Sequence, residues 1–495
     1  MAKKYLNYIN GEWKPASSGE WSENRNPAHW NEVVGLFPKS GSAEINEAVA
    51  AARVAFKEWR LVPAPERGNL MKKVGDLMVE RKEDLARDMT REMGKVMAET
   101  RGDVQEGIDT AFYAATEGRR LFSNTSPSEL RNKVNLSFRM PIGVAGLITP
   151  WNFPMAIPCW KSLPALLCGN CIILKPATDT PLTTQHLVEI FAEAGFPKGV
   201  VNLVHGGGSA VGNALVEHPG VDIISFTGSS EIGKQINAKA GASLKRVSLE
   251  LGGKNAQIVM DDADLALALD GVLWGAFGTT GQRCTATSRL IVHKAVYDQF
   301  TEMLIEAVSK LKVGDGLDPA SNVGPVVNQS QIDTVKSYVE IGKAEGARLV
   351  VGGHQLDKGT YKEGFFFAPT VFTDVTPKMR LFQEEIFGPV LSVTKVKDFD
   401  EAITVHNDCI YGLSSSIYTK DVNRAFRAAR DLEAGITYIN AATIGAECHM
   451  PFGGVKQTGN GHREGGWAVY EFYSEYKTVY IDFAGKLQRA QIDNY

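Results

Sequence analysis

Residues 171–204 read CIILKPATDTPLTTQHLVEIFAEAGFPKGVVNLV, and this stretch decides the fold. It begins with Cys171-Ile172-Ile173-Leu174, a short continuous apolar run that is typical of a buried strand. Thr180 and Pro181 then predict a helix N-cap followed by a first-turn proline. The helix should end at Gly195, because glycine readily adopts the left-handed conformation that closes a helix.

The same alternation continues toward the C-terminus. Residues 200–204 (VVNLV), 223–226 (IISF) and 247–250 (VSLE) predict three more strands, with helical segments between them. Strands that alternate with helices at this interval indicate a parallel, right-handed, doubly wound sheet. A second α/β region is predicted after Gly253.

Upstream, the pattern is helical from about residue 45 to residue 116. Ile45, Val49, Ala52 and Phe56 are spaced by four, three and four residues, so they form one apolar face. Two further segments, 134–138 (VNLSF) and 478–483 (TVYIDF), alternate polar and apolar residues like half-exposed strands. Such strands leave open edges that proteins usually cover.

The composition is that of an ordinary globular protein. The chain has 495 residues, of which 44% are hydrophobic and 22% charged, and its formal net charge is −4. This length predicts roughly three domains. The negative charge argues against a general nucleic-acid binder, and no nucleic-acid partner is expected.

No targeting or membrane segment is predicted. A basic start without an apolar core behind it does not resemble a signal peptide. The apolar stretch 155–174 contains Lys161, Asn170, Pro158 and Pro164, which do not suit a lipid-exposed span. We therefore expect a cytoplasmic, reducing compartment, which also suits a reactive thiol.

The six cysteines show no disulfide framework. Cys168 and Cys171 form a Cys-x-x-Cys without a second pair, and we interpret them as buried residues of an apolar, strand-like run. Cys448 and His449 lack a third ligand. No metal is expected.

Cys284 and Glu250 are the candidate catalytic pair. Each stands in a glycine-rich segment, GQRCT (281–285) and LELGG (249–253). A thiol can attack a carbonyl, and a carboxylate can then activate water against the thioester. Alone, Cys284 could be a buried apolar residue and Glu250 a surface carboxylate.

Seven motifs occur in order around this pair: PWNFP (150–154), LKPA (174–177), FTGS (226–229), ELGG (250–253), GQRC (281–284), EEIFGP (384–389) and PFGG (451–454). Together they resemble the NAD(P)-dependent aldehyde dehydrogenase superfamily. The resemblance extends from NGEW (10–13) to YKT (476–478).

The resemblance implies an α/β fold with three parts. Residues 1–122, 142–252 and 451–470 would form a Rossmann-like dinucleotide-binding domain, and residues 253–450 the catalytic domain. Residues 123–141 and 471–495 would supply a small β extension that mediates oligomerisation, and a C-terminal tail. A homo-oligomer, dimer or tetramer, is expected.

The cofactor site lacks the usual Gly-x-Gly-x-x-Gly fingerprint. FTGSSEIG (226–233) stands in its place, where Gly228 permits close approach and Ser229 with the helix amides can meet a pyrophosphate. By resemblance, Lys175 binds the adenosine ribose, Glu385 the nicotinamide ribose, and Phe387 shapes the nicotinamide pocket. The full set assigned to the cofactor is Ile148, Thr149, Pro150, Trp151, Lys175, Ala177, Thr178, Gly208, Gly212, Phe226, Thr227, Gly228, Ser229, Ile232, Leu251, Gly252, Glu385 and Phe387.

Thr178 is a departure from the family pattern. Many NAD-preferring members carry Glu at this position, where it binds the 2′-hydroxyl and repels a 2′-phosphate. With Thr178 the expected cofactor is NAD, and NADP stays open.

The implied reaction is oxidation of an aldehyde to a carboxylic acid through a thiohemiacetal and a thioester on Cys284. Asn152 and the Cys284 amide would stabilise the oxyanion, Glu250 would activate water, and Lys161 with Glu464 would relay the proton. For Asn152 a structural role in a turn, and for Lys161 a surface role, are the alternatives. The alternatives for the whole protein are a CoA-acylating semialdehyde dehydrogenase, a thiol hydrolase or a non-catalytic family member.

The substrate is predicted to be a small aliphatic aldehyde or a semialdehyde that carries a carboxylate. Arg283 would favour an anionic tail or lower the pKa of the thiol; a structural ion pair is the alternative. The loop at 444–450 should face the far end of the aldehyde with exposed amides. The residues assigned to the substrate are Arg283, Thr285, Gly445, Ala446 and Phe452.

Overall fold

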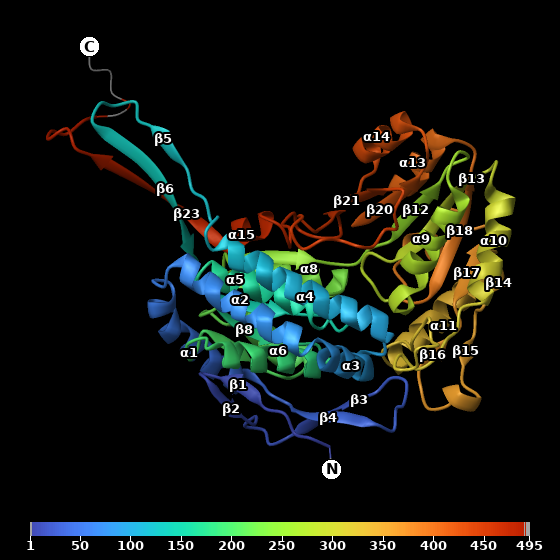
Figure 1. Cartoon of the computed structure of the whole chain (residues 1–495), viewed down its shortest axis with the longest axis horizontal. Coiled ribbons are helices and arrows are strands. Elements are labelled where there is room, and N and C mark those ends of the chain that lie inside the picture. The colour runs from blue at the N-terminus through green and yellow to red at the C-terminus, as the bar shows by residue number, and fades with distance from the viewer. Residues whose placement is uncertain (1, 490, 492–495) are drawn as a thin grey trace.

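A computed structural model describes residues 2–489 and 491 of the chain. Residue 1, and residues 490 and 492–495 of the predicted tail, lie outside the described residues. Two seven-stranded sheets and one small projecting sheet organise the molecule (Figure 1).

The first sheet is the doubly wound sheet predicted from residues 171–204. Five of its strands, from the edge strand β11 to β9, run parallel, and β1 pairs antiparallel to β9 at the other side. The strand order is β11 (Arg246–Glu250), β10 (Ile223–Thr227), β7 (Val144–Ile148), β8 (Cys171–Lys175), β9 (Val201–Leu203), β1 (Asn7–Ile9) and β2 (Glu12–Lys14).

Helix α6 (Pro181–Ala194) follows β8 and ends as predicted at Gly195, whose φ is +95°. The predicted N-cap is only partly correct. Thr180 occupies the position, but its hydroxyl makes no cap hydrogen bond. Glu92 caps the helix instead, accepting hydrogen bonds from the amides of Leu182 (2.8 Å) and Thr183 (2.7 Å).

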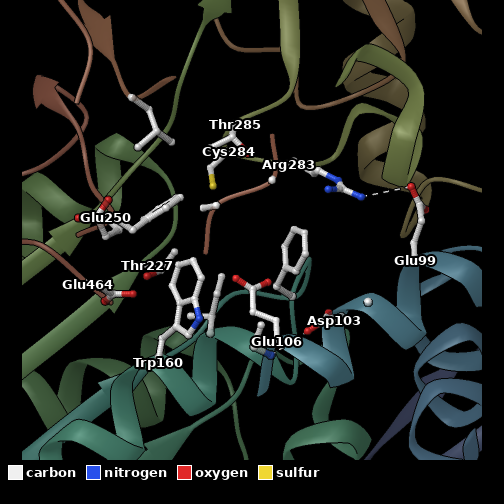
Figure 2. A pocket seen from close by; sticks show the side chains of 18 of the residues that line it. Glu99, Asp103, Glu106, Trp160, Thr227, Glu250, Arg283, Cys284, Thr285 and Glu464 are labelled. Atoms are coloured by element: carbon white, nitrogen blue, oxygen red, sulfur yellow. Dashed lines mark hydrogen bonds and ion pairs between the residues drawn. The ribbon is translucent and has the colours of Figure 1, made fainter. Parts of the chain in front are cut away.

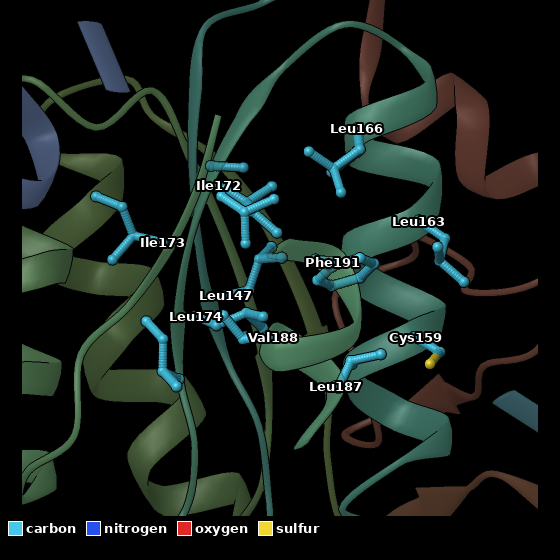
Figure 3. Packing of buried hydrophobic residues seen from close by; sticks show 14 of the residues in the cluster. Leu147, Cys159, Leu163, Leu166, Ile172, Ile173, Leu174, Leu187, Val188 and Phe191 are labelled. Atoms are coloured by element: carbon cyan, nitrogen blue, oxygen red, sulfur yellow. The ribbon is translucent and has the colours of Figure 1, made fainter. Parts of the chain in front are cut away.

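Apolar side chains join this sheet to its helices. Leu163 and Leu166 of α5 (Ala156–Leu167) pack with Leu187 and Phe191 of α6 beside the strands (Figure 3). Leu174 of β8 is fully buried, and burying such a side chain stabilises the fold by about 1.5–3 kcal/mol. The other helices of this part are α1 (Ser42–Trp59), α2 (Ala64–Glu80), α3 (Lys82–Met93), α4 (Met97–Glu117), α7 (Asn213–Glu217), which continues a π-helical turn at Gly208–Gly212, α8 (Ser230–Gly241) and α15 (Ala468–Phe472).

The second sheet contains the strands that follow Gly253. Only its edge strand β14 is antiparallel. The strand order is β14 (Arg348–Val351), β17 (Thr370–Thr373), β18 (Val390–Val396), β13 (Thr287–His293), β12 (Asn255–Val259), β20 (Ser414–Tyr418) and β21 (Ile436–Ile439). Its helices are α9 (Leu265–Phe277), α10 (Tyr297–Ser309), α11 (Gln329–Ala344), α12 (Arg380–Gln383), α13 (Phe399–Asn407) and α14 (Val422–Asp431).

The two predicted half-exposed strands pair with each other. β6 (Lys133–Pro141) and β23 (Ser474–Asp482) are antiparallel along nine residue pairs, and β5 (Thr125–Pro127) adds a third strand. This small sheet projects from the body of the molecule (Figure 1). The remaining strands form two-stranded ladders: β3 (Trp21–Arg25) with β4 (Val33–Pro38), β15 (Gln355–Leu356) with β16 (Phe366–Phe367), and β19 (Tyr411–Gly412) with β22 (Val455–Lys456).

The apolar stretch at 155–174 divides into helix α5, a turn and strand β8. Cys168 lies at the end of α5, so the interpretation that placed it in a strand-like run was wrong, although its predicted burial is confirmed. In the part of the chain that the structure describes, no helix is both long and apolar enough to cross a membrane.

Candidate active site

The loop that carries Cys284 is held by backbone geometry. A 3-10 turn at Gly278–Gly281 precedes it, and Gly281 has φ +70°. A Cβ on Gly281 would lie 2.2 Å from the carbonyl oxygen of Gly388, so no larger residue fits. Asn255, on β12, donates hydrogen bonds from its amide to the carbonyls of Cys284 (2.8 Å) and Ala286 (2.9 Å). The loop that carries the thiol is thereby held just before β13, which begins at Thr287.

Cys284 lies between two cavities. The larger has a volume of about 340 Å³ and the smaller about 200 Å³. Thr227, Leu251 and Cys284 line both. A molecule in either cavity can therefore contact the same sulfur.

Glu250 stands at the end of β11 and lines the larger cavity with Cys284 (Figure 2). It is 4% exposed, and no described residue donates a hydrogen bond to either carboxylate oxygen. Burial raises the pKa of this carboxyl well above its usual range, and the charge of Glu464 raises it further. Glu250 is therefore a buried, uncommitted acid rather than a surface carboxylate.

Lys161 and Glu464 form a buried ion pair, and the charge of Glu464 acts on Glu250. Lys161 is fully buried and also donates a hydrogen bond to the Ser225 hydroxyl (2.8 Å), which excludes the surface alternative. Glu464 exchanges backbone hydrogen bonds with Phe452 (2.6 and 2.7 Å). The chain thus returns from the second sheet to place Glu464 beside Glu250.

Asn152 is buried, and its amide donates a hydrogen bond to the Gln282 carbonyl (3.0 Å). That bond links the PWNFP turn to the loop of the thiol. An amide nitrogen carries two hydrogens, so one donor remains for a ligand in the smaller cavity, which Asn152 lines.

The structure decides between the alternatives for Arg283 only in part. Its Nη2 pairs with Glu99 (3.2 Å) and its Nε donates to the Thr279 hydroxyl (2.8 Å), as Figure 2 shows for Glu99. Its charge does not lower the pKa of the thiol: burial raises the pKa of Cys284 to about 12, and the charges of Glu250 and Glu385 add to this effect. Arg283 still lines the larger cavity, and none of the described residues accepts a hydrogen bond from its Nη1.

The smaller cavity collects half of the predicted cofactor residues. Glu385 accepts a hydrogen bond from the Gly253 amide (2.8 Å), and burial raises its pKa to about 7. A Cβ on Gly252 would lie 2.4 Å from the Glu385 carboxylate, so that position requires glycine. The predicted residues that line this cavity are Pro150, Trp151, Thr227, Gly228, Ser229, Leu251, Gly252, Glu385 and Phe387.

The turn between β10 and α8 has the form that an anion requires. Ser229 is the N-cap of α8, and its hydroxyl accepts a hydrogen bond from the Ile232 amide (3.4 Å). The amides of the first turn of a helix lack partners within the helix and can bind an anion. Together with the aromatic wall, where Phe387 meets Trp151 edge-on at 5.3 Å, these residues fit a dinucleotide.

The other predicted cofactor residues do not line the smaller cavity. Lys175 is buried at the end of β8, which excludes the solvated alternative, and burial lowers its pKa to about 8. Thr178 is exposed beyond the same strand end. The remaining ones are Ile148, Thr149, Ala177, Gly208, Gly212, Phe226 and Ile232, which lie on the strands, turns and helix starts of the first sheet.

All five residues assigned to the substrate line the larger cavity: Arg283, Thr285, Gly445, Ala446 and Phe452. Phe452 packs on Trp160, with ring centroids 4.8 Å apart. No described residue accepts a hydrogen bond from the amides of Gly445 or Ala446.

Sequence reasoning missed several residues of both cavities. Gln331 lines the smaller cavity, and no motif marks it. Its side-chain amide donates a hydrogen bond to the backbone carbonyl of Phe387 (2.9 Å) and so holds that loop. Glu99, Asp103 and Glu106 line the larger one from α4. Their spacing of four and three residues places them on one helix face, which is a signal that the sequence does contain.

Comparison with known proteins decides the family. The sequence profile of the aldehyde dehydrogenase family matches residues 13–479. The chain belongs to the aldehyde dehydrogenase family. It is 44% identical to the α-ketoglutaric semialdehyde dehydrogenase of Bacillus subtilis, over 96% of this chain and 98% of the relative. It is 45% identical to the α-ketoglutarate semialdehyde dehydrogenase of Haloferax volcanii, over 98% and 100%.

Solved structures agree with this assignment. Betaine aldehyde dehydrogenase from Staphylococcus aureus, solved with NAD+, superimposes with a TM-score of 0.95 at 37% identity, covering 98% of this chain and 95% of that one. The protein is therefore an NAD(P)-dependent oxidoreductase that converts an aldehyde to a carboxylic acid. This confirms the predicted fold and reaction class.

Proposed function

We propose that this aldehyde dehydrogenase oxidises a short semialdehyde with a carboxylate at its far end, specifically 2,5-dioxopentanoate. The observation that carries the proposal is Arg283, the single cation among the residues that line the larger cavity. Its Nη1 and the unpaired amides of Gly445 and Ala446 offer donors to an anion at a distance from Cys284.

The relatives support this substrate without selecting it alone. The names α-ketoglutaric semialdehyde and 2,5-dioxopentanoate describe one compound, and the relative from Saccharolobus solfataricus with the second name is 42% identical. Succinate-semialdehyde dehydrogenase GabD of Escherichia coli is 41% identical and aldehyde dehydrogenase 1A1 of Mus musculus 42%. Because the chain is about equally identical to relatives with three classes of substrate, sequence identity does not select among these substrates. The residues that line the cavity must do so.

In the proposed chemistry, the Cys284 thiol releases its proton to water, and the sulfur attacks the aldehyde carbon to form the oxyanion of a thiohemiacetal. The remaining amide hydrogen of Asn152 and the Cys284 backbone N–H stabilise its oxyanion. The bound nicotinamide supplies the acceptor for the hydride that leaves the substrate carbon. Cys284 then holds a thioester.

Glu250 completes the turnover. Its lack of hydrogen-bond partners leaves it free to take a proton from water, and attack of the hydroxide on the thioester releases the acid and restores the thiol. Lys161, Ser225 and Glu464 form a connected polar chain behind Glu250 that supports their role as the proton relay.

For the cofactor, we propose that Ser229 and the α8 amides hold the pyrophosphate, and that Glu385 and Lys175 hold the two riboses. Ile148, Thr149, Pro150, Trp151, Ala177, Thr178, Gly208, Gly212, Phe226, Thr227, Gly228, Ile232, Leu251, Gly252 and Phe387 complete the proposed binding surface. The boundaries expected from the sequence at residues 122, 142, 252, 450 and 470 stay our proposal for the domains.

We also propose a homo-oligomer, dimer or tetramer, built through the projecting sheet. Val134, Phe138, Tyr480, Ile481 and Phe483 expose apolar surface there, between 41% and 64% each. All six cysteines are unpaired. An unpaired catalytic thiol suits the cytoplasm, where we place the enzyme.

The test compares kcat/KM for 2,5-dioxopentanoate, succinate semialdehyde and pentanal, measured by absorbance of reduced nicotinamide. We expect the highest value for 2,5-dioxopentanoate. Equal or faster turnover of uncharged pentanal would refute the carboxylate anchor and leave a general aldehyde dehydrogenase.

A further inference from the structure

Helix α4 presents three acids to the larger cavity, and their partners differ. Glu99 binds Arg283 and the Thr279 amide (2.7 Å). Asp103 forms a fully buried ion pair with Lys95 (2.7 Å) and accepts a hydrogen bond from the amide of Ala156 (2.7 Å).

Glu106, the third acid, has no such partner. No described residue makes a hydrogen bond or an ion pair with its carboxyl group, although the residue is partly buried. Figure 2 shows this carboxyl group pointing from α4 into the open space below Cys284, beside Trp160. An uncommitted polar group inside an apolar-walled cavity is positioned to meet a ligand.

The surroundings keep this carboxyl protonated near neutral pH. Burial raises the pKa of Glu106 to about 8, the charges of Asp103 and Asp109 act in the same direction, and Arg283 and Lys95 oppose them. From other elements, Tyr438 of β21, Cys448 of the 444–450 loop and Cys159 of α5 also lie within its electrostatic range. A neutral carboxyl group is a hydrogen-bond donor.

We propose that Glu106 determines specificity by donating a hydrogen bond to an oxygen at the end of the substrate remote from the aldehyde. This inference rests on the proposed function, because 2,5-dioxopentanoate carries a carboxylate and a 2-oxo group at that end. Arg283 then supplies the charge for the anion, and Glu106 supplies a neutral donor that does not repel it.

The ionisation of Glu106 sets the direction of the pH effect on substrate binding. Below about pH 8 Glu106 is neutral and donates to the substrate. Above that pH it becomes an anion that repels a carboxylate, so KM for 2,5-dioxopentanoate should rise about tenfold between pH 7 and pH 9. KM for pentanal, which has no charge, should not follow this rise.

The experiment measures KM and kcat/KM for 2,5-dioxopentanoate and pentanal from pH 6.5 to 9.5. Glu106→Gln keeps a donor of the same shape that does not titrate, so the alkaline rise in KM should disappear. Glu106→Leu removes the donor, and the ratio of kcat/KM for the two substrates should fall by about tenfold or more. Asp109→Asn is the matched control on the same helix, outside the cavity, and should keep the alkaline rise, moved to slightly lower pH because the charge of Asp109 helps to raise the pKa of Glu106.

Two results would overturn the role of Glu106 alone: an unchanged alkaline rise in Glu106→Gln, or equal losses for both substrates in Glu106→Leu. A wild-type preference for pentanal would instead overturn the proposed substrate, and this inference with it. The two failures are therefore distinguished by the wild-type enzyme.

Discussion

Replacing Arg283 with Met should convert a semialdehyde dehydrogenase into a general aldehyde dehydrogenase. Arg283 offers its Nη1 to the cavity while Glu99 and Thr279 hold the rest of the guanidinium in place. A hydrogen bond to a charged group contributes about 1.5–3 kcal/mol. At about 1.4 kcal/mol for each factor of ten, kcat/KM for 2,5-dioxopentanoate should fall roughly 10- to 150-fold.

The variant has a second effect that must be separated from the first. The side chains of Arg283 and Glu99 are each 12% exposed, so removing one leaves the other poorly solvated. Glu99 retains the Thr279 amide, and the expected loss of stability is about 1–3 kcal/mol. The double variant Arg283→Met with Glu99→Gln removes both charges and should recover much of this stability, but not the semialdehyde preference.

The assay is reduced-nicotinamide absorbance with 2,5-dioxopentanoate and pentanal, alongside thermal unfolding of each variant. Met is apolar and of similar length, so turnover of pentanal should change little. Glu99→Gln alone frees Arg283 and should maintain or raise the preference for the charged substrate. If Arg283→Met loses both substrates equally, the residue positions the Cys284 loop and does not bind the substrate.

Three further predictions concern the shared chemistry. Cys284→Ala should lower steady-state turnover at least about a thousandfold while cofactor binding, measured by fluorescence titration, persists; near-normal turnover contradicts the nucleophile assignment. Glu250→Gln should give one burst of reduced nicotinamide and then stall, and mass spectrometry should find acylated Cys284; a lost burst without an acyl adduct places Glu250 earlier in the reaction. Thr178→Glu should raise KM for NADP several-fold more than for NAD, because a carboxylate at this position would repel a 2′-phosphate; an unchanged ratio shows that selectivity lies elsewhere.

The first sheet was predictable because its signals are local. The continuous apolar run at 171–174 predicts a strand in which every side chain is buried, as β8 is. Gly195 closes α6 with the backbone conformation that glycine favours. The same local rules failed at Thr180. The carboxylate that caps α6 comes from Glu92, on another helix, and no sequence pattern near Thr180 indicates this contact.

The candidate site likewise combines residues that the sequence identifies with surroundings that only the fold shows. Cys284, Glu250 and Glu385 stand in recognisable motifs, but their environments depend on distant segments. The return of the chain through Phe452 and Glu464 sets the electrostatics of Glu250, and only the fold shows it. The spacing of the acids on α4 can be seen in the sequence, but only the structure shows that they line the larger cavity.

The acids that line the larger cavity would repel the anionic substrate that we propose if all of them were charged and unpaired, and burial and ion pairing prevent this. Burial raises the pKa of Glu106 to about 8. Glu464 and Asp103 are neutralised by buried lysines, and Glu99 by Arg283. Near neutral pH Glu106 therefore contributes a hydrogen-bond donor more than negative charge, and the donors of Arg283 and the 444–450 loop are left to attract a carboxylate. The same burial makes this balance sensitive to alkali, because Glu106 adds repulsion beside the proposed substrate once it loses its proton.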